Sequence, residues 1–195
     1  MKGIDFSKIT TFFSKIVDLN DEEKKHLVNK LEVFHFKKKD VIVKEGATSK
    51  YVYFVNNGTL RSYYLKDGEE FTTQFYFENS YCASYSSFLT QSKGRINIEC
   101  LSDVELLALS FENVQNMYEN SKAFNTFGRR ISEFLYIDFF ERSSSFLLDD
   151  AKTRYLNLVT GRPEVLKSIP NYMIASYIGI TPESLSRLKK QLLKE

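Results

Sequence analysis

The chain has few of the side chains that build metal centres or covalent catalytic sites. Its 195 residues include no Trp, two Cys and two His. Cys82 and Cys100 are too few for a disulfide framework or a four-thiolate iron–sulfur cluster, and we expect both to lie in strands as small buried apolar residues. Only His35 falls in the β-rich part of the sequence, so the cluster of His and carboxylate ligands of a cupin-type metal enzyme cannot form there. We therefore expect no enzyme activity, no metal site and no cofactor.

The chain also has no long hydrophobic run and no large net charge. No apolar stretch approaches the length of a membrane span, and Asp5 and Lys8 interrupt the N-terminal apolar residues, so neither a membrane helix nor a signal peptide is indicated. We expect a cytoplasmic location without membrane contact. The net charge is +2, yet residues 151–195 hold eight Lys/Arg against three Asp/Glu. A basic C-terminal module on a slightly acidic body fits a DNA-binding end, although a merely solvated basic face would look the same.

The segment from Asn171 to Lys190 has the pattern of a helix-turn-helix. Apolar residues recur at core spacing in two short runs, and Gly179 lies between them, where a turn with positive φ is easiest without a Cβ. Thr181 can N-cap the second helix, and Pro182 suits its first position. A helical hairpin in any α-rich domain can show similar apolar spacing. The tight turn and the adjacent cap favour instead a unit that carries its second helix into a DNA major groove.

Residues 33–109 have the pattern of short strands separated by turns. Asn57-Gly58 and Asp67-Gly68 are hairpin signals, and the 17 Phe and 12 Tyr residues of the chain favour a β-containing core. Closely spaced strands of this kind are typical of a sandwich or barrel such as a jelly roll. The expected strands are Val33–Phe36, Val41–Val43, Tyr51–Val55, Thr59–Leu65, Phe71–Phe77, Ile96–Leu101 and Glu105–Leu109.

Helices are expected on both sides of the strands. Residues 5–30 and Phe111–Tyr118 have helical patterns, and a long helix is expected from about Ser121 to Phe146, with a hinge from Ser143 to Asp150. The long helix has too many aromatic residues for one side of an isolated helix. We expect part of it to pack on the β-domain and part on a second copy of itself, and the alternative is burial wholly within its own chain. The predicted fold class is α+β: a jelly roll with flanking helices, a long dimerisation helix and a small C-terminal helix-turn-helix domain.

This order of elements resembles that of the bacterial Crp/Fnr (catabolite-activator and fumarate–nitrate-regulator) transcription regulators, over nearly the whole chain. Lys38–Gly46 is similar to the first β-turn segment of that family, Tyr53–Gly58 to the hairpin before its next strand, and Asp67–Glu70 to the following hairpin. The domains implied by the resemblance are a cyclic-nucleotide-binding-like jelly-roll sensor at residues 1–120, a dimerisation helix and hinge at 121–148, and a helix-turn-helix DNA-binding domain at 149–195.

The ligand motif of the family's cyclic-nucleotide-binding members is degenerate in this chain. Those members have Phe-Gly-Glu followed further along by Arg-Ser or Arg-Thr, whereas here Cys82-Ala83-Ser84 is followed by Arg95-Ile96. Only the Arg matches, so cyclic AMP is not expected to bind, and an unrelated small-molecule effector or no effector is favoured. The polar candidates for an effector pocket are Ser84, Arg95, Asn97 and Arg61.

The recognition helix, expected at residues 181–193, keeps part of the family's Arg-Glu-x-x-x-Arg pattern. Glu183 and Arg187 match, while Pro182 replaces the first Arg. Glu can accept a hydrogen bond from a cytosine amino group, and Arg can bind guanine bidentately. No β-wing follows before Glu195, so we expect fewer phosphate contacts than in winged relatives. The expected DNA-contacting residues are Asn171, Tyr172, Thr181, Glu183, Ser184, Ser186, Arg187 and Lys190.

The sequence therefore predicts a DNA-binding transcription regulator. It would act as a homodimer on a two-fold symmetric operator in double-stranded DNA, with the jelly roll sensing an effector or serving as a scaffold. RNA polymerase is a further candidate partner. The alternative is a small-molecule sensor that acts through protein partners, with weak or vestigial DNA binding.

Overall fold

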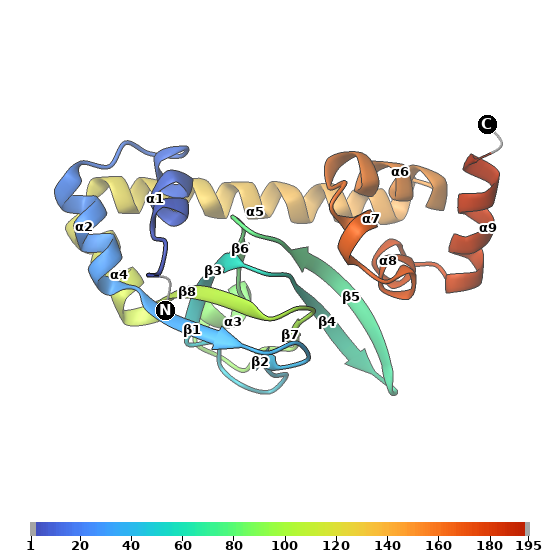
Figure 1. The fold of residues 1–195 in the computed structure, drawn as a ribbon, viewed down its shortest axis with the longest axis horizontal. Helices are drawn as coiled ribbons and strands as arrows, with labels where there is room; N and C mark the ends of the chain where they lie inside the picture. Colours follow the sequence, from blue (N-terminus) through green and yellow to red (C-terminus); the bar gives the residue numbers. More distant parts are fainter. Residues whose placement is uncertain (1–2, 194–195) are drawn as a thin grey trace. The chain divides into compact units, whose positions relative to one another are not determined.

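A computed structural model describes residues 3–193 and gives the order of elements drawn in Figure 1. The helices are α1 (Ser7–Ser14), α2 (Asp21–Lys30), α3 (Tyr85–Thr90), α4 (Phe111–Asn120), α5 (Lys122–Leu148), α6 (Ala151–Gly161), α7 (Val165–Ser168), α8 (Asn171–Ile178) and α9 (Pro182–Leu192). The strands are β1 (Glu32–Phe36), β2 (Val41–Val43), β3 (Tyr51–Asn57), β4 (Leu60–Lys66), β5 (Glu69–Tyr76), β6 (Tyr81–Cys82), β7 (Asn97–Cys100) and β8 (Val104–Ser110). Within residues 3–193, no helix has the length and apolar character needed to cross a bilayer.

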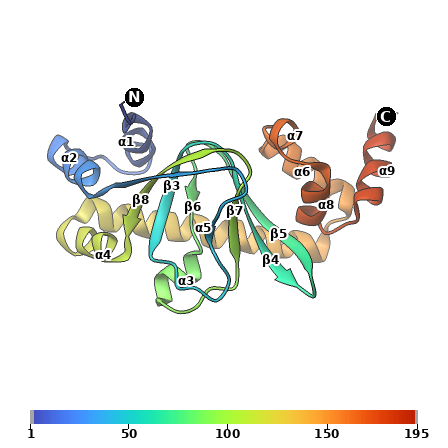
Figure 2. The ribbon, with the colours of Figure 1, turned by 60° about the horizontal axis from the view of Figure 1, so that its bottom comes forward.

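The strands form two four-stranded sheets that share one core. The orders are β1-β8-β3-β6 and β2-β7-β4-β5, and β8 pairs antiparallel with both β1 and β3 (Figure 2). Val55 and Leu106 from the first sheet meet Leu60 and Ile98 from the second, and all four side chains are fully buried. Burial of apolar side chains from both sheets is the main force that holds such a sandwich together. The predicted α+β class with a jelly roll is confirmed.

The turn chemistry explains one hairpin directly. Asp67 and Gly68 both have positive φ, at 53° and 83°, which is the conformation that a tight two-residue hairpin requires. Three short elements were not expected from the sequence: the strand β6 and the helices α3 and α7. All three are too short to carry a periodic pattern, and β6 is defined by its pairing with β3.

The N-terminal region expected to be helical over residues 5–30 forms two helices, α1 and α2. The first ends at Ser14, and the second begins after Asn20, whose side chain accepts from the Glu23 N–H while the Glu23 side chain accepts from the Asn20 N–H. This reciprocal capping box starts a new helix and therefore ends the preceding segment. In α1, the Phe13 ring stacks on Phe127 of α5 with the ring centroids 3.8 Å apart.

Helix α5 runs further than predicted and changes its surroundings along its length. Its first part buries Phe124, Phe127 and Ile131, and both Phe rings lie against Phe13 of α1. The Ser143–Ser145 segment, expected to begin a hinge, is helical, because α5 continues to Leu148. Only Asp149 and Asp150 separate α5 from α6, and the Asp150 side chain caps α6 by accepting from the Thr153 N–H at 2.8 Å.

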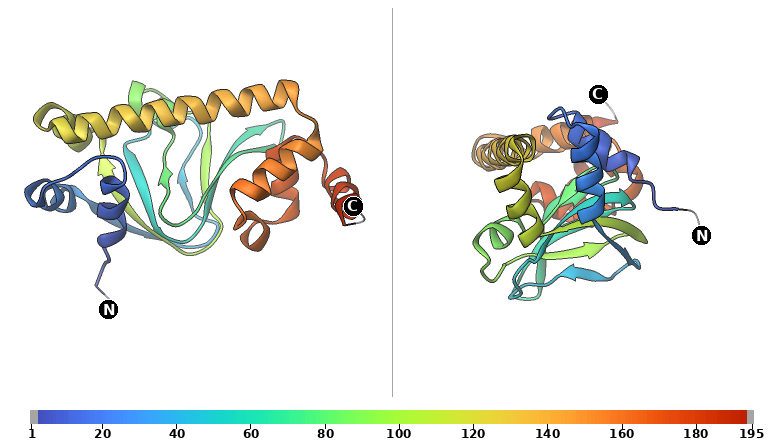
Figure 3. Two further views of the ribbon diagram at one scale, coloured as in Figure 1. Left: turned by 90° about the horizontal axis from the view of Figure 1, so that it is seen from above. Right: turned by 90° about the vertical axis from the view of Figure 1, so that its left-hand side faces the viewer.

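The chain divides into two compact units. The first comprises residues 1–62 and 75–133, and the second comprises 63–74 and 134–195. The second unit thus contains the end of α5, the helices α6 to α9 and the outer part of the β4–β5 hairpin (Figure 3). The two units are defined by how densely their residues contact one another. Their bounds differ from those of the three functional domains expected from the sequence, which stay a prediction.

Candidate nucleic-acid interface

Helices α8 and α9 form the predicted helix-turn-helix around a small apolar centre. Gly179 has a φ of 74° and ends α8 in a left-handed conformation, and its N–H donates to the Ser176 carbonyl while the Ile180 N–H donates to the Ala175 carbonyl. This pair of hydrogen bonds is the Schellman motif, which turns the chain sharply after a helix. A Cβ on Gly179 would also lie 2.8 Å from a Phe146 ring carbon. The turn therefore requires Gly for both its φ and its packing.

The core of this unit is tightly closed. Ile174 and Ile178 of α8 and Leu185 of α9 each have at most 1% of their surface exposed, and Ala175 has none. Ala175 carries the smallest side chain of the four, which allows the two helices to approach closely. Of the recurring apolar residues, Ile174, Ile178 and Leu185 form the interior, whereas Ile180 and Leu188 are half-buried. The opposite face of α9 is left for other contacts.

The N-terminus of α9 is capped as the sequence indicated. Thr181 is the N-cap and accepts from the Ser184 N–H at 3.3 Å, and Pro182 occupies the first turn. The basic residues Lys189 and Lys190 lie in the last turn, where they oppose the negative end of the helix dipole. Helix α9 is therefore stabilised at both ends by its own sequence.

Removing the cap should weaken this helix measurably. Thr181→Ala deletes the hydroxyl that accepts from the Ser184 N–H, and we expect the free energy of unfolding to fall by about 1 kcal/mol. Thr181→Ser keeps the hydroxyl and is the matched control. Urea unfolding followed by circular dichroism measures both variants, and equal stabilities of the Ala and Ser variants would contradict a capping role.

The predicted base-contacting side chains lie on the exposed face of α9. Glu183, Ser186, Arg187 and Lys190 are all exposed, and Arg187 donates to the Ser184 hydroxyl at 3.3 Å. The pKa of Glu183 lies below its usual value, because its carboxylate is hydrogen-bonded to its own backbone N–H and to Thr181. The helix thus presents an ionised acceptor and a guanidinium donor on one exposed surface.

Two further predicted contact residues begin α8. Tyr172 is exposed, and Asn171 is exposed but accepts a hydrogen bond at its Oδ1 from the Lys189 Nζ at 2.9 Å. This contact joins the first turn of α8 to the last turn of α9. The sequence prediction missed Lys189, whose role depends on a partner 18 positions away.

The four candidates for an effector pocket differ in how far they are exposed to solvent. Ser84 and Asn97 are buried, while Arg95 is exposed. The Asn97 Oδ1 accepts from the Glu45 N–H at 3.0 Å, and Ser84 packs against Gly94, where a Cβ would lie 3.0 Å from its hydroxyl. Asn97, at the start of β7, and Ser84, just before α3, therefore each contact a neighbouring loop of the fold.

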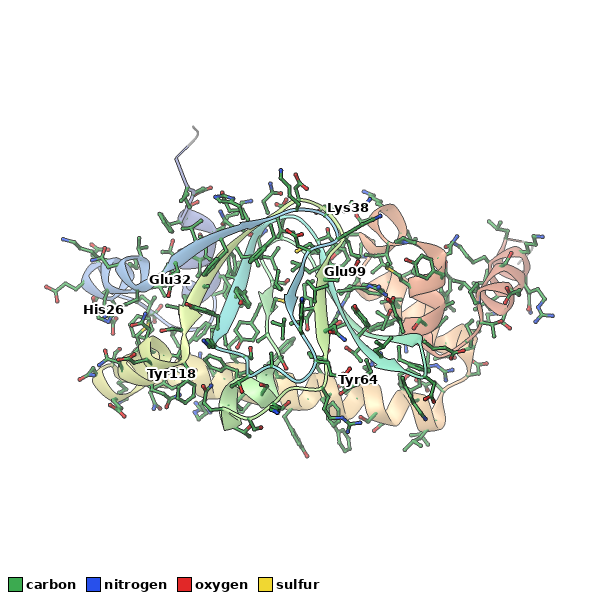
Figure 4. All side chains as sticks on the ribbon, turned by 90° about the horizontal axis from the view of Figure 1, so that it is seen from below. His26, Glu32, Lys38, Tyr64, Glu99 and Tyr118 are labelled. Carbon is green, nitrogen blue, oxygen red and sulfur yellow. The ribbon has the colours of Figure 1, made fainter. Side chains whose placement is uncertain are left out.

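Arg61 is paired with a carboxylate. It lies on β4 with only 4% of its side chain exposed, and its Nε and Nη2 donate to one carboxylate oxygen of Glu99 on β7, at 3.0 and 2.7 Å. Glu99 is labelled in Figure 4. A buried guanidinium needs such a partner, because desolvation of an unpaired charge is costly. Glu99 thus neutralises the charge of Arg61, which was one of the polar candidates for an effector pocket.

The two cysteines are inert, as expected from the sequence. Cys82 on β6 and Cys100 on β7 are both fully buried. Burial raises the pKa of the Cys100 thiol to about 12 and the pKa of Cys82 well above its usual value. Since the thiolate is the nucleophile and the metal ligand, both groups are unreactive at neutral pH. Among residues 3–193, no group of three or more His, Cys, Asp or Glu side chains is placed to hold a metal ion.

Comparisons with known proteins agree with this architecture. Residues 33–121 match the family described as Cyclic nucleotide-binding domain. A regulator of the Crp/Fnr family from Eubacterium rectale has 20% identity and a TM-score of 0.68, over 90% of this chain and 84% of that chain. FixK2 from Bradyrhizobium japonicum has 19% identity and a TM-score of 0.69, over 84% and 85%. A mutant of CooA from Carboxydothermus hydrogenoformans has 18% identity and a TM-score of 0.70, over 90% and 81%. No curated protein sequence matches the chain.

The match to the family described as Cyclic nucleotide-binding domain covers residues 33–121 and is a likeness of that region to the domain family. The fold of the chain is similar to that of the Crp/Fnr regulator from Eubacterium rectale and to those of FixK2 and CooA. The resemblance noted in the sequence is thus confirmed at the level of the fold.

Proposed function

We propose that the protein is a homodimeric transcription regulator that reads two-fold symmetric DNA with α9. The observation that carries this proposal is the closed, capped α8–α9 unit with Glu183 and Arg187 exposed on one helix face. The guanidinium of Arg187 suits the O6 and N7 acceptors of guanine, and the carboxylate of Glu183 suits the amino group of cytosine. Ser186 and Lys190 on the same face supply contacts to base edges or phosphates.

The end of α5 supports the dimer. Ile137, Phe140, Ser144 and Leu147 follow one another at intervals of three, four and three residues, which is the spacing of a coiled-coil seam. In the single chain Ile137 is 54% exposed, Phe140 60% and Leu147 86%. So many large apolar side chains on one helix are unfavourable in water unless a partner covers them. A second copy of α5 is the partner whose pattern matches, and it would place two α9 helices on two half-sites.

The jelly roll then senses an effector or holds the dimer together. Its ligand motif is degenerate and Arg61 is neutralised by Glu99, so this proposal assigns it no cyclic AMP. A contact with RNA polymerase is needed only if the protein activates transcription, and not if it represses transcription.

Selection of bound duplexes from a random DNA pool tests the proposal. Purified full-length protein at moderate salt should enrich an inverted repeat whose half-site centres lie about 10 base pairs, or a multiple, apart. Enrichment of a single unrepeated site would contradict the dimer. Failure to enrich any sequence, together with binding to a protein partner, would favour the sensor with vestigial DNA binding.

A further inference from the structure

Ser176, on the first helix of the helix-turn-helix, is hydrogen-bonded to the backbone of the β4–β5 hairpin. Its hydroxyl accepts from the Thr72 N–H and donates to the Glu70 carbonyl, each at 2.9 Å. Both peptide groups belong to β5, which is the last strand in the order of its sheet. An edge strand presents N–H and C=O groups that need partners. One side chain of α8 therefore takes the place of a neighbouring strand at this point.

Arg142 makes a second connection between the same elements. Its guanidinium lies over the Tyr177 ring of α8, 3.9 Å from the centroid. It donates to the carbonyls of Thr73, Thr72 and Tyr177, the last two at 3.4 and 3.2 Å. Burial lowers the pKa of Arg142, and the Tyr177 ring, the carbonyls and the negative charge of Asp138 offset the loss of its water. A single side chain of α5 thus contacts both β5 and α8.

A third set of contacts lies further along the hairpin. Gln74 donates to Asp138 of α5 at 3.4 Å and accepts from Arg162, which follows α6. Arg162 also forms an ion pair with Asp138, at 3.7 Å. The contacts of Ser176, Arg142 and Gln74 all involve residues 70–74, and we call this set the hairpin clasp.

We propose that the hairpin clasp fixes the position of the helix-turn-helix in the dimer, with Ser176 and Arg142 as positioning residues. The inference rests on the proposed DNA-reading function. The clasp covers Ser176 and Tyr177 of α8, while Glu183 and Arg187 of α9 stay exposed. The clasped arrangement thus leaves the predicted base-contacting face of α9 accessible.

The expected effect of opening the clasp is on spacing rather than on base preference. Two α9 helices held at one separation select operators of one half-site spacing. Without the clasp, the link between α5 and α6 at Asp149 and Asp150 allows a range of separations. A dimer that binds both half-sites at once gains affinity only when the separation of its two α9 helices matches the operator. Without a fixed separation, the protein loses this gain. The contacts of each α9 with its own half-site do not change.

The first experiment measures the clasp without DNA. In the full-length protein, amide hydrogen exchange should show a protected Thr72 N–H, and Ser176→Ala should speed its exchange roughly tenfold through loss of the hydroxyl acceptor. Ser168→Ala, an exposed serine at the end of α7, is the matched control and should change nothing at Thr72. Rapid exchange of Thr72 in the wild type would overturn the proposal.

The second experiment measures DNA binding on a series of inverted repeats with different spacers. We expect Ser176→Ala and Arg142→Lys to keep the wild-type affinity for one half-site within about twofold. At the preferred spacing their affinity should fall roughly tenfold, and their discrimination between spacings should be lost. Wild-type spacing selectivity in both variants would overturn the proposal. A wild type that binds no duplex would overturn the proposed function and the positioning role, while Thr72 exchange would still report whether the clasp forms.

Discussion

Replacing Ile137 and Phe140 together by Glu should make the protein monomeric and reduce its affinity for a two-fold symmetric operator by at least about 100-fold. Each apolar side chain contributes about 1.5–3 kcal/mol to the dimer when a partner helix buries it. The Glu residues of the two chains would instead face one another and repel. Because both side chains are more than half exposed in the single chain, the substitution removes little packing within the monomer.

Analytical ultracentrifugation measures the oligomeric state, and titration with full and half operators measures the loss of affinity. Phe139→Glu is the matched control. Phe139 is 69% exposed on the same helix, but it lies outside the seam of Ile137, Phe140, Ser144 and Leu147. We expect this variant to stay dimeric. A dimeric double variant, or a wild type that sediments as a monomer, would show that α5 is not the dimer interface.

Arg187→Ala should weaken binding to the selected operator by about 1–3 kcal/mol, which is roughly 5- to 150-fold, with little change on unrelated DNA. The exposed guanidinium has one hydrogen bond described within the chain, to the Ser184 hydroxyl, so its removal should leave the fold intact. A base-reading side chain contributes only on the correct sequence. Fluorescence anisotropy with operator and with scrambled duplex separates the two affinities.

Lys190→Ala is the matched comparison on the same helix. A side chain that neutralises a phosphate contributes to every sequence, so this variant should lose affinity uniformly and reduce the slope of log affinity against log salt by about 1. The same uniform loss for Arg187→Ala would remove its proposed base contact and leave it as a phosphate ligand.

The sequence by itself determined the elements whose signals are local. Gly179 and Thr181 indicate a turn and a cap because a left-handed φ and a hydrogen bond to a residue three positions ahead depend on near neighbours. Asp67-Gly68 determined its hairpin in the same way. The many aromatic residues of α5 indicated that the helix has apolar side chains on more than one side. In the structure Ile137 and Phe140 are exposed.

Tertiary structure decided the contacts between residues that are distant in sequence. The Arg61–Glu99 pair spans 38 positions and the Thr72–Ser176 hydrogen bond spans 104. Nothing in the neighbouring residues distinguishes Ser176 from an ordinary helix serine, or Arg142 from a solvated arginine. Their roles arise because folding brings the edge strand β5 against α8. Hydrogen-bond partners of this kind are set by the packing of whole elements, whereas turns and caps are set by the chain next to them.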